Sequence, residues 1–158
     1  MITIRFARKT DAPAIVALAK AMADHHYALD PEHYRKSSEY EKLENYPEEW
    51  INDKSSAIVV AEEDNALKGY AVAAIENAKD FMAPHIKKIG VIHGVFIETA
   101  SRKKGIGRAL VMKAIEWLQK KGAGHIELTV DANNNESYAA WKKLGFEDYK
   151  IRMRLDQK

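Results

Sequence analysis

Two glycines and four basic residues stand close together in the second half of the chain. The basic residues are Arg102, Lys103, Lys104 and Arg108, and the glycines are Gly105 and Gly107. Glycine has no Cβ and adopts positive φ at little cost, so an anion can approach its backbone closely. Charged arginine and lysine donors bind phosphate oxygens more strongly than neutral donors do. These residue types at this spacing predict a cradle for the phosphate groups of a cofactor.

A cradle of this kind needs a strand before it and a helix after it. Residues 89–97 are rich in β-branched and aromatic side chains, which predicts a buried strand. Residues 106–121 carry apolar side chains at three- and four-residue spacing, which predicts a helix with one apolar face. The first turn of that helix leaves backbone N–H groups unpaired at the positive end of the helix dipole. This order of elements favours phosphate binding; the alternative is a solvated basic turn before a surface helix.

Two other phosphate-binding loops do not fit the sequence. A P-loop ends in Gly-Lys-Ser/Thr, whereas Gly107 is followed by Arg108 and Ala109. A dinucleotide-binding fingerprint needs a third glycine, and Leu110 stands at that position. A nucleotide-binding protein built on either loop is therefore disfavoured.

The spacing Arg-x-x-Gly-x-Gly, which residues 102–107 satisfy, resembles the acyl-CoA-binding motif of the GNAT acetyltransferase superfamily. A second match lies downstream, where Asn134 is followed by Ser137, a bulky residue at 141 and Leu144-Gly145-Phe146. This segment is similar to the family's later Asn…Ala/Ser…Tyr…Gly-Phe pattern. The two motifs span about residues 91–146, and together they are more specific than either is alone.

The resemblance implies that acetyl-CoA is the cosubstrate. The family pattern places the pantetheine arm along a strand, the pyrophosphate on the amides of the glycine loop, and an asparagine on the opposite side. No metal ligand is expected. The residues expected to bind the cofactor are Val95, Phe96, Ile97, Arg102, Lys103, Lys104, Gly105, Ile106, Gly107, Arg108, Asn134 and Trp141.

The acceptor implied by the resemblance is a primary amine, which must be neutral to attack a thioester. An amine of this kind has a pKa of ~10.4, so a general base helps. His93 is the candidate, because the ordinary pKa of histidine, ~6.5, suits acid–base work. Strand alternation predicts that His93 shares a face with Val95 and Ile97. The alternative is a structural histidine in the sheet, and Glu98 is a weaker candidate for the base.

One position departs from the family pattern. The family usually has a tyrosine four residues before the glycine of Gly-Phe, as general acid for the leaving thiolate, and here that residue is Trp141. An indole N–H donates hydrogen bonds but releases no proton near neutral pH. Tyr138 lies one helical turn earlier and is the candidate acid, with an ordinary packed aromatic as the alternative.

The composition of the chain limits the number of domains, the partners and the cysteine chemistry that can be expected. The chain has 158 residues, 46% of them hydrophobic and 30% charged, which predicts a single globular domain over residues 1–158. The formal charge of +2 gives no reason to expect a nucleic-acid partner. There are no cysteines, so no disulfide or thiol nucleophile is present. Neither a signal peptide nor a membrane span is expected, and the cytoplasm is the expected location.

The remaining chain is compatible with the fold that the resemblance implies. That fold is a mixed α/β (α+β) domain with a mostly antiparallel sheet of six to seven strands, about four helices, and the cofactor in a cleft between two splayed strands. The pattern of apolar residues predicts strands over 2–7, 57–62, 67–76, 125–130 and 149–155. It predicts helices over 11–24 and 135–144 and irregular helices over 31–45 and 47–51. A loop with Pro84 is predicted over 77–88.

The leading hypothesis is an N-acetyltransferase that works by direct transfer. The acceptor is open among small amines, protein N-termini and lysines, and the carboxylates of residues 30–49 slightly favour a small cationic amine. The alternatives are a non-catalytic acyl-CoA-binding module and an unrelated nucleotide-binding protein. His25 and His26 are expected to be structural or to border the substrate site. A homodimer is expected from the family alone.

If Tyr138 is the general acid, Tyr138→Phe should lower kcat with little change in acetyl-CoA affinity, because only the proton on the phenol is removed. Steady-state kinetics together with calorimetry of acetyl-CoA binding checks this. An unchanged kcat would remove Tyr138 from the mechanism.

Overall fold

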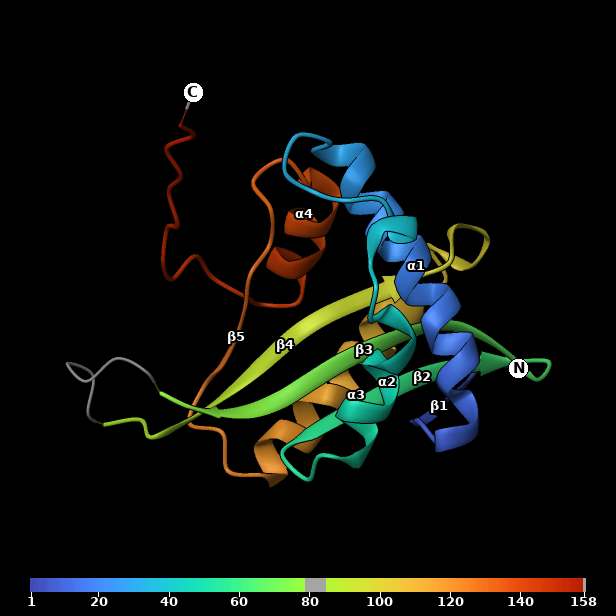
Figure 1. Ribbon diagram of the computed structural model, residues 1–158. Coiled ribbons are helices and arrows are strands. Elements are labelled where there is room, and N and C mark those ends of the chain that lie inside the picture. Colours follow the sequence, from blue (N-terminus) through green and yellow to red (C-terminus); the bar gives the residue numbers. More distant parts are fainter. Residues whose placement is uncertain (79–84, 158) are drawn as a thin grey trace.

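The computed structural model describes residues 1–78 and 85–157. Within these residues, one five-stranded sheet has the order β1-β2-β3-β4-β5 (Figure 1). The strands are β1 (Thr3–Phe6), β2 (Ser56–Glu63), β3 (Ala66–Asn77), β4 (Lys88–Ile97) and β5 (Ile126–Leu128). The first four strands pair antiparallel, and β5 joins β4 in parallel.

Helices cover both faces of this sheet. The α-helices are α1 (Ala12–Leu29), α2 (Tyr46–Asn52), α3 (Ile106–Lys120) and α4 (Asn135–Lys143). Short 3₁₀ turns lie at Lys9–Asp11, Ser37–Glu39, Leu43–Asn45 and Thr99–Ser101. Among the described residues, no helix is long and apolar enough to cross a membrane.

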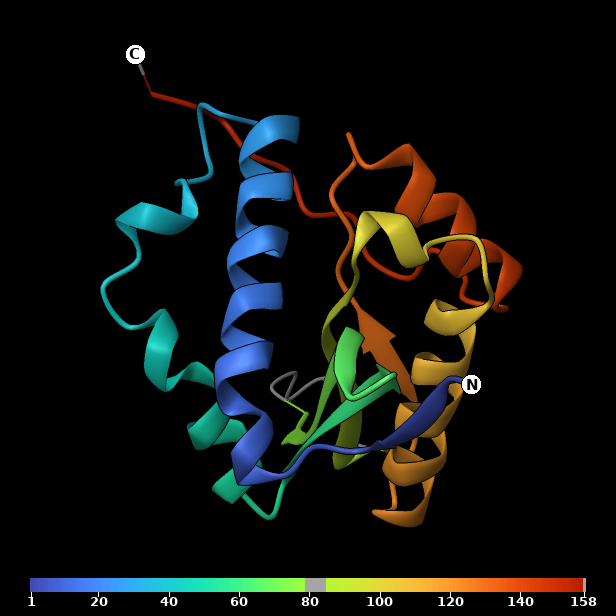
Figure 2. The same ribbon diagram turned by 90° about the vertical axis from the view of Figure 1, so that its right-hand side faces the viewer.

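Two hydrophobic clusters hold the layers together, one on each face of the sheet. One cluster joins α3 to the sheet through Leu110, Ala114 and Leu118, all fully buried. The other joins α1 through Ile15 and places Tyr70 of β3 beneath it. Figure 2 shows α1 and α3 on opposite sides of the strands. The alternation of apolar side chains in β2 and β3 therefore supplies both cores, as a sheet covered on two faces requires.

Strand β4 contains one extra residue at His93. Val72 of β3 pairs with Gly94 and Ala73 pairs with Ile92, which leaves His93 between them without an opposite residue in the β3–β4 ladder. A bulge of this kind shifts the alternation of side chains by one residue. Val95 and Ile97 accordingly pack against the α3 cluster, whereas the ring of His93 contacts Trp50 of α2. The prediction that His93 shares a face with Val95 and Ile97 is therefore wrong, because alternation cannot anticipate a bulge.

Strands β4 and β5 separate soon after they meet. Their ladder has three pairs, of which the last joins Ile92 to Leu128, while β4 runs on to Ile97. The end of the ladder falls immediately before the bulge. The predicted pair of splayed strands is thus present, and it lies beside the glycine loop that follows β4.

Several predicted elements differ from the structure. Five strands are found among the described residues instead of six to seven, since residues 149–155 form no strand. Residues 31–45 contain two 3₁₀ turns in place of an irregular helix. Helix α1 runs to Leu29, five residues beyond its predicted end at Asp24. Part of the predicted loop over 77–88, including Pro84, lies outside the described residues.

Gly69 of β3 should be sensitive to any side chain. A Cβ there would lie 2.6 Å from the carbonyl oxygen of Phe96, a backbone atom that cannot move without disturbing β4. We expect Gly69→Ala to lower the free energy of unfolding by about 1–3 kcal/mol, the usual cost of overpacking. Urea denaturation measures this.

Gly94→Ala is the matched control, because its Cβ would meet only the flexible side chain of Met22, at 3.6 Å. Equal losses of stability in the two variants would contradict the explanation.

Candidate active site

The backbone of the glycine loop is not covered by other atoms around Gly105, at the start of α3. Gly105 is the N-cap residue with φ of 78°, and a Cβ there would meet nothing within 4 Å. Its carbonyl accepts the first helical hydrogen bond, from the Ala109 N–H at 3.1 Å. The amides of the first turn that follows have no intrahelical partner. Lys103 also holds a positive φ of 61°, so the loop turns tightly twice before the helix begins.

Gly107 brings this turn against the end of β4. A Cβ on Gly107 would lie 3.1 Å from Cδ1 of Ile97, which is closer than such contacts usually are. The missing side chain therefore lets the first turn of α3 approach the strand. The predicted loop residues and the predicted strand residues are brought together in this way.

Arg102 connects the loop to the same strand end. Its Nε donates a hydrogen bond to the carbonyl oxygen of Ile97 at 3.1 Å, and its guanidinium lies 5.8 Å from the ring centre of Phe96. This side chain thus holds the loop in place, a role that the motif alone did not indicate. Binding of the cofactor by Arg102 remains a prediction.

The backbone of β4 points hydrogen-bonding groups toward the side from which β5 has diverged. The N–H of Glu98 donates to the carbonyl of Lys68 in β3, at 3.0 Å. Neighbouring residues of a strand point their N–H and C=O groups to opposite sides. The N–H groups of Ile97 and, two residues earlier, Val95 therefore point away from β3. An extended ligand arm lying there would find the donors and acceptors that a further strand would use.

His93 is held by a carboxylate on the neighbouring strand. Its Nε2 lies 2.8 Å from Oε1 of Glu76, and its ring centre lies 4.8 Å from that of Trp50. The side chain is one-third exposed, so it is not a core histidine. A neutral imidazole that donates from Nε2 to Glu76 keeps Nδ1 as a proton acceptor. Glu76 and Trp50 were not expected from the sequence, since 17 and 43 residues separate them from His93.

The asparagine of the second motif caps α4. The Oδ1 of Asn134 accepts a hydrogen bond from the Ser137 N–H at 3.1 Å, which satisfies one free donor of the first turn. Trp141 meets Phe146 edge-on with a 5.4 Å centroid distance, and both rings pack against the α3 cluster. The structure therefore gives both residues structural contacts, and their part in binding the cofactor stays a prediction.

The hydroxyl of Tyr138 is engaged on the surface. It donates to the carboxylate of Asp148 at 3.0 and 2.9 Å, and the side chain is 40% exposed. This hydrogen bond raises the pKa of Tyr138 above its ordinary value. A phenol with a raised pKa gives up its proton less readily, so the geometry weighs against the predicted acid role, which stays a prediction.

A cluster that the sequence did not reveal lies at the end of α1. The Tyr34 hydroxyl donates to Asp131 at 2.8 and 2.7 Å, and Nδ1 of His26 lies 3.3 Å from the same carboxylate. The rings of His26 and Tyr34 stack with centres 5.1 Å apart. Burial, followed by the hydrogen bond to Asp131, raises the pKa of Tyr34 to about 12. The end of α1 is thus joined to the loop that follows β5.

The neighbouring His25 lies within electrostatic reach of the glycine-loop segment. Burial lowers its pKa first, and the positive charge of Arg102 lowers it further, while Glu136 of α4 raises it. The sequence showed only two adjacent histidines at a helix end. The folded chain places His26 beside Asp131, and the prediction that the two histidines are structural or border the substrate site stays a prediction.

The carboxylates expected to attract a cationic substrate are dispersed. Glu39 accepts a hydrogen bond from the backbone N–H of Lys36, and Glu44 lies 3.9 Å from Lys20. Glu41 and Glu44 line a small surface pocket of about 410 Å³ with Lys20 and Tyr40. His93 is not among the described residues that line this pocket.

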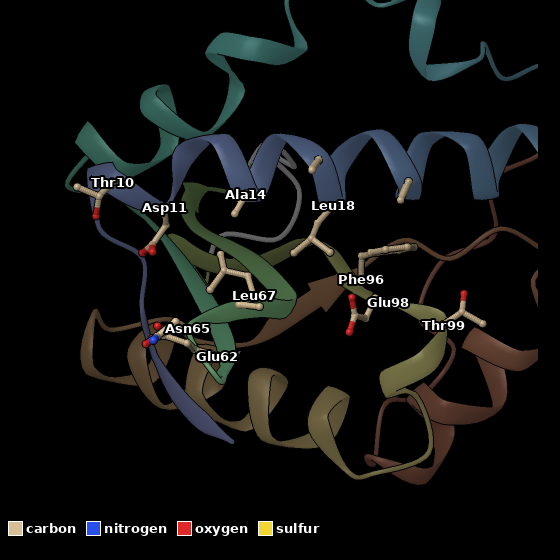
Figure 3. A pocket seen from close by; sticks show the side chains of 13 residues that line it. Thr10, Asp11, Ala14, Leu18, Glu62, Asn65, Leu67, Phe96, Glu98 and Thr99 are labelled. Carbon is tan, nitrogen blue, oxygen red and sulfur yellow. The ribbon is translucent and has the colours of Figure 1, made fainter. Parts of the chain in front are cut away.

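A larger hollow of about 560 Å³ lies between the first half of α1, the turn between β2 and β3, and the end of β4 (Figure 3). Its apolar wall includes Leu18, Leu67 and Phe96. Its three carboxylates have cationic partners: Arg5 contacts Asp11 and Glu62, each at 2.7 Å, and Lys68 lies 3.1 Å from Glu98. Of the predicted cofactor-binding residues, the hollow includes Phe96 alone, and it also includes Glu98, the weaker candidate for the base; it is distinct from the glycine loop.

Among residues 1–78 and 85–157, no group of three or more His, Asp or Glu side chains is placed to hold a metal ion.

Comparison with known proteins agrees with both motifs. A model of the acetyltransferase (GNAT) family matches residues 19–146. The chain is 34% identical over 99 residues to a mycothiol acetyltransferase of Renibacterium salmoninarum, covering 63% of this chain and 28% of that protein. It is 30% identical over 117 residues to an N-alpha-acetyltransferase of Sulfurisphaera tokodaii, covering 68% and 69%.

The fold has close relatives among solved structures. An aminoglycoside N-acetyltransferase, AAC(6')-Iy, in complex with CoA superposes with a TM-score of 0.77 at 20% identity, covering 100% of this chain and 95% of the other. At that identity the likeness concerns the fold. The chain spans less than a third of the length of the mycothiol acetyltransferases it matches.

The two ends of α3 allow a controlled test of the cradle. Gly105 and Gly122 both hold positive φ, at 78° and 85°, and neither has an atom within 4 Å of its missing Cβ. We expect Gly105→Ala and Gly122→Ala each to cost about 1–2 kcal/mol of unfolding free energy from backbone strain. Only Gly105→Ala should also weaken coenzyme A binding in calorimetry, because only Gly105 adjoins the anion-binding end of the helix.

Equal affinity for coenzyme A in both variants, with similar losses of stability, would show that the loop does not hold the phosphates.

Proposed function

The chain belongs to the GNAT acetyltransferase family, whose members use acetyl-CoA. From this premise we propose that it transfers the acetyl group to a primary amine by direct attack of the amine in a ternary complex. The observation that carries the proposal is the start of α3. There, a left-handed glycine opens the helix beside a strand end whose N–H groups face away from β3.

Two stretches of backbone would hold acetyl-CoA. The amides of residues 106–108 would bind the pyrophosphate, because they lie at the positive end of the α3 dipole. The backbone of residues 95–97 would bind the pantetheine arm as a neighbouring strand would. Lys103, Lys104 and Arg108 would add charge-assisted contacts to the phosphates. When bound, the cosubstrate supplies the activated acetyl group.

The N–H of Ile97 is suited to stabilise the oxyanion. By strand alternation it points away from β3, and a backbone donor fixed in a strand needs no reorganisation when negative charge develops on the thioester oxygen. Arg102 fixes the adjoining carbonyl at 3.1 Å, which restrains the orientation of this peptide segment.

His93 would accept the proton of the attacking amine. Glu76 orients the imidazole through the 2.8 Å contact at Nε2 and stabilises the imidazolium once the proton has arrived at Nδ1. As the neutral amine nitrogen attacks the acetyl carbon, it would give this proton to His93, and the carbon–sulfur bond would then break. The departing thiolate takes a proton from solvent or, if its predicted role holds, from Tyr138.

A small cationic amine is the acceptor we favour. Aminoglycoside acetyltransferases share the fold, and two carboxylates, Asp131 beside His26 and Asp30 beside His33, lie near the end of α1. A protein N-terminus or lysine is the alternative, since the chain resembles an N-alpha-acetyltransferase. A non-catalytic acyl-CoA-binding module is a further alternative, which the departure at Trp141 motivates.

The test is release of CoA from acetyl-CoA with a panel of polyamines, aminoglycosides, amino acids and peptides. The chain has no cysteine, so a thiol reagent reports only the CoA that is formed. With the best amine, we expect His93→Gln to lower kcat/KM by roughly 10²–10⁴, the usual contribution of a general base, with unchanged acetyl-CoA affinity.

His125→Gln is the matched control, because His125 also lies beside a glutamate, with 3.1 Å from its Nε2 to Glu127. Equal effects of the two substitutions would remove His93 from the mechanism. Acetyl-CoA binding without CoA release for any amine would favour the non-catalytic module.

A further inference from the structure

One contact with a carboxylate cannot fix the orientation of the His93 ring. The Nε2 of His93 lies 2.8 Å from Oε1 of Glu76, and this contact restrains one atom of the imidazole. The ring can still turn about that atom, and such a turn moves Nδ1, the other ring nitrogen. One-third of the His93 side chain is exposed, and the residue has no opposite residue in the β3–β4 ladder. A second restraint is needed to keep Nδ1 in one place.

The indole ring of Trp50 makes the second contact. Its centre lies 4.8 Å from the centre of the His93 ring, and the two ring planes make an angle of 58°. Rings whose centres are this close are packed directly against one another. Glu76 lies on β3 and Trp50 on α2, so the imidazole is held from two separate elements. One of them restrains the position of a nitrogen, and the other restrains the plane of the ring.

Trp50 is itself held by its neighbours. The buried hydroxyl of Ser56 donates a hydrogen bond to the carbonyl oxygen of Trp50 at 2.7 Å. The ring of Tyr46, on the same helix, lies 6.1 Å from the indole between centres. Both aromatic side chains pack against the hydrophobic cluster that joins α1 to the sheet. The contact with His93 is therefore made from a side chain that the core keeps in place.

We propose that Trp50 is a positioning residue for proton transfer: its ring holds the imidazole of His93 so that Nδ1 faces the attacking amine. The inference rests on the proposed function, because His93 needs a fixed orientation only if it accepts the proton. A general base works only within hydrogen-bond reach of the proton that it takes. A displacement of about 1 Å can lower a reaction rate by roughly 100-fold. Removal of the indole should therefore slow the reaction through His93, without loss of a contact to either substrate.

A double-mutant cycle on CoA release with the best amine tests whether Trp50 acts through His93. We expect Trp50→Leu to lower kcat by roughly 10- to 100-fold, with little change in KM for either substrate. In a His93→Gln background no base is left to orient, so Trp50→Leu should lower kcat by less than about 2-fold. Trp50→Phe keeps an aromatic ring on the same backbone and should retain most of the activity.

Trp117→Leu is the matched control. Trp117 is also a half-buried tryptophan that packs against a hydrophobic cluster, in this case the α3 cluster on the other face of the sheet. We expect this variant to keep the kcat of wild type. Urea denaturation of both leucine variants shows how much stability each has lost, so that a general loss of stability is separated from a loss of positioning. If Trp50→Leu does not fold, Trp50→Met takes its place in the cycle.

Tryptophan fluorescence measures the contact without any reaction. A protonated imidazole quenches the emission of an adjacent indole. Among the ring contacts of residues 1–78 and 85–157, the Trp50–His93 pair is the only one between a tryptophan and a histidine. Burial raises the pKa of Tyr46 to about 12, so this neighbouring phenol stays neutral while histidines titrate. We expect emission to fall as the pH is lowered through the histidine range, His93→Gln to abolish that step, and His125→Gln to keep it.

The outcomes separate this inference from the proposed function. An equal loss of kcat from Trp50→Leu with and without His93 would overturn the inference alone, since Trp50 would then act elsewhere. A fluorescence step that His93→Gln leaves unchanged would also overturn it, because the two rings would not be in contact. Absence of CoA release with every amine would overturn the proposed function and the inference together, even if the fluorescence step is present.

Discussion

The extra residue at His93 is the constraint on which the candidate site depends. Because His93 has no opposite residue in the β3–β4 ladder, β4 changes the direction of its side chains between Ile92 and Gly94. The ladder to β5 ends at Ile92, immediately before the bulge. A bulge bends its strand and increases the local twist, which agrees with the separation of β4 from β5 at this point. The extra residue therefore lies where the β4 edge becomes free of β5. It is also the histidine whose side chain lies on the face opposite to Val95 and Ile97.

Helix α3 serves the core and the site with different parts of its length. Its middle and end bury Leu110, Ala114 and Leu118 against the sheet, which fixes the position of the helix. Its first turn then presents backbone amides at a defined place beside β4. Dispersion and hydrophobic contacts hold the body of the helix, so the N-terminal amides remain available to a ligand. Because these amides are already ordered, binding of the ligand requires no further loss of their conformational entropy.

The residues that contact His93, and those that hold the end of α1, come from elements far apart in sequence. Glu76 lies on β3 and Trp50 on α2, and both contact His93. Tyr34, His26 and Asp131 join the end of α1 to the loop after β5. These contacts connect the end of α1 to the loop that leads to α4, so a movement of α1 would also disturb that loop. The site is therefore supported by tertiary contacts even where its ligand-facing groups are local backbone.

The sequence by itself determined the features that depend on neighbours along the chain. The glycine loop, the strand before it and the amphipathic α3 are set by residue types within a few positions of one another, so their patterns could be interpreted directly. The tertiary structure alone decided which face His93 occupies, that Glu76 and Trp50 accompany it, and that Tyr138 contacts Asp148. It also decided that residues 149–155, which alternate as a strand should, form no strand in the described part of the chain. A bulge, an ion pair between strands and the pairing of a strand edge are all set by long-range register. Register is chosen by the fit of the whole sheet and not by the local pattern.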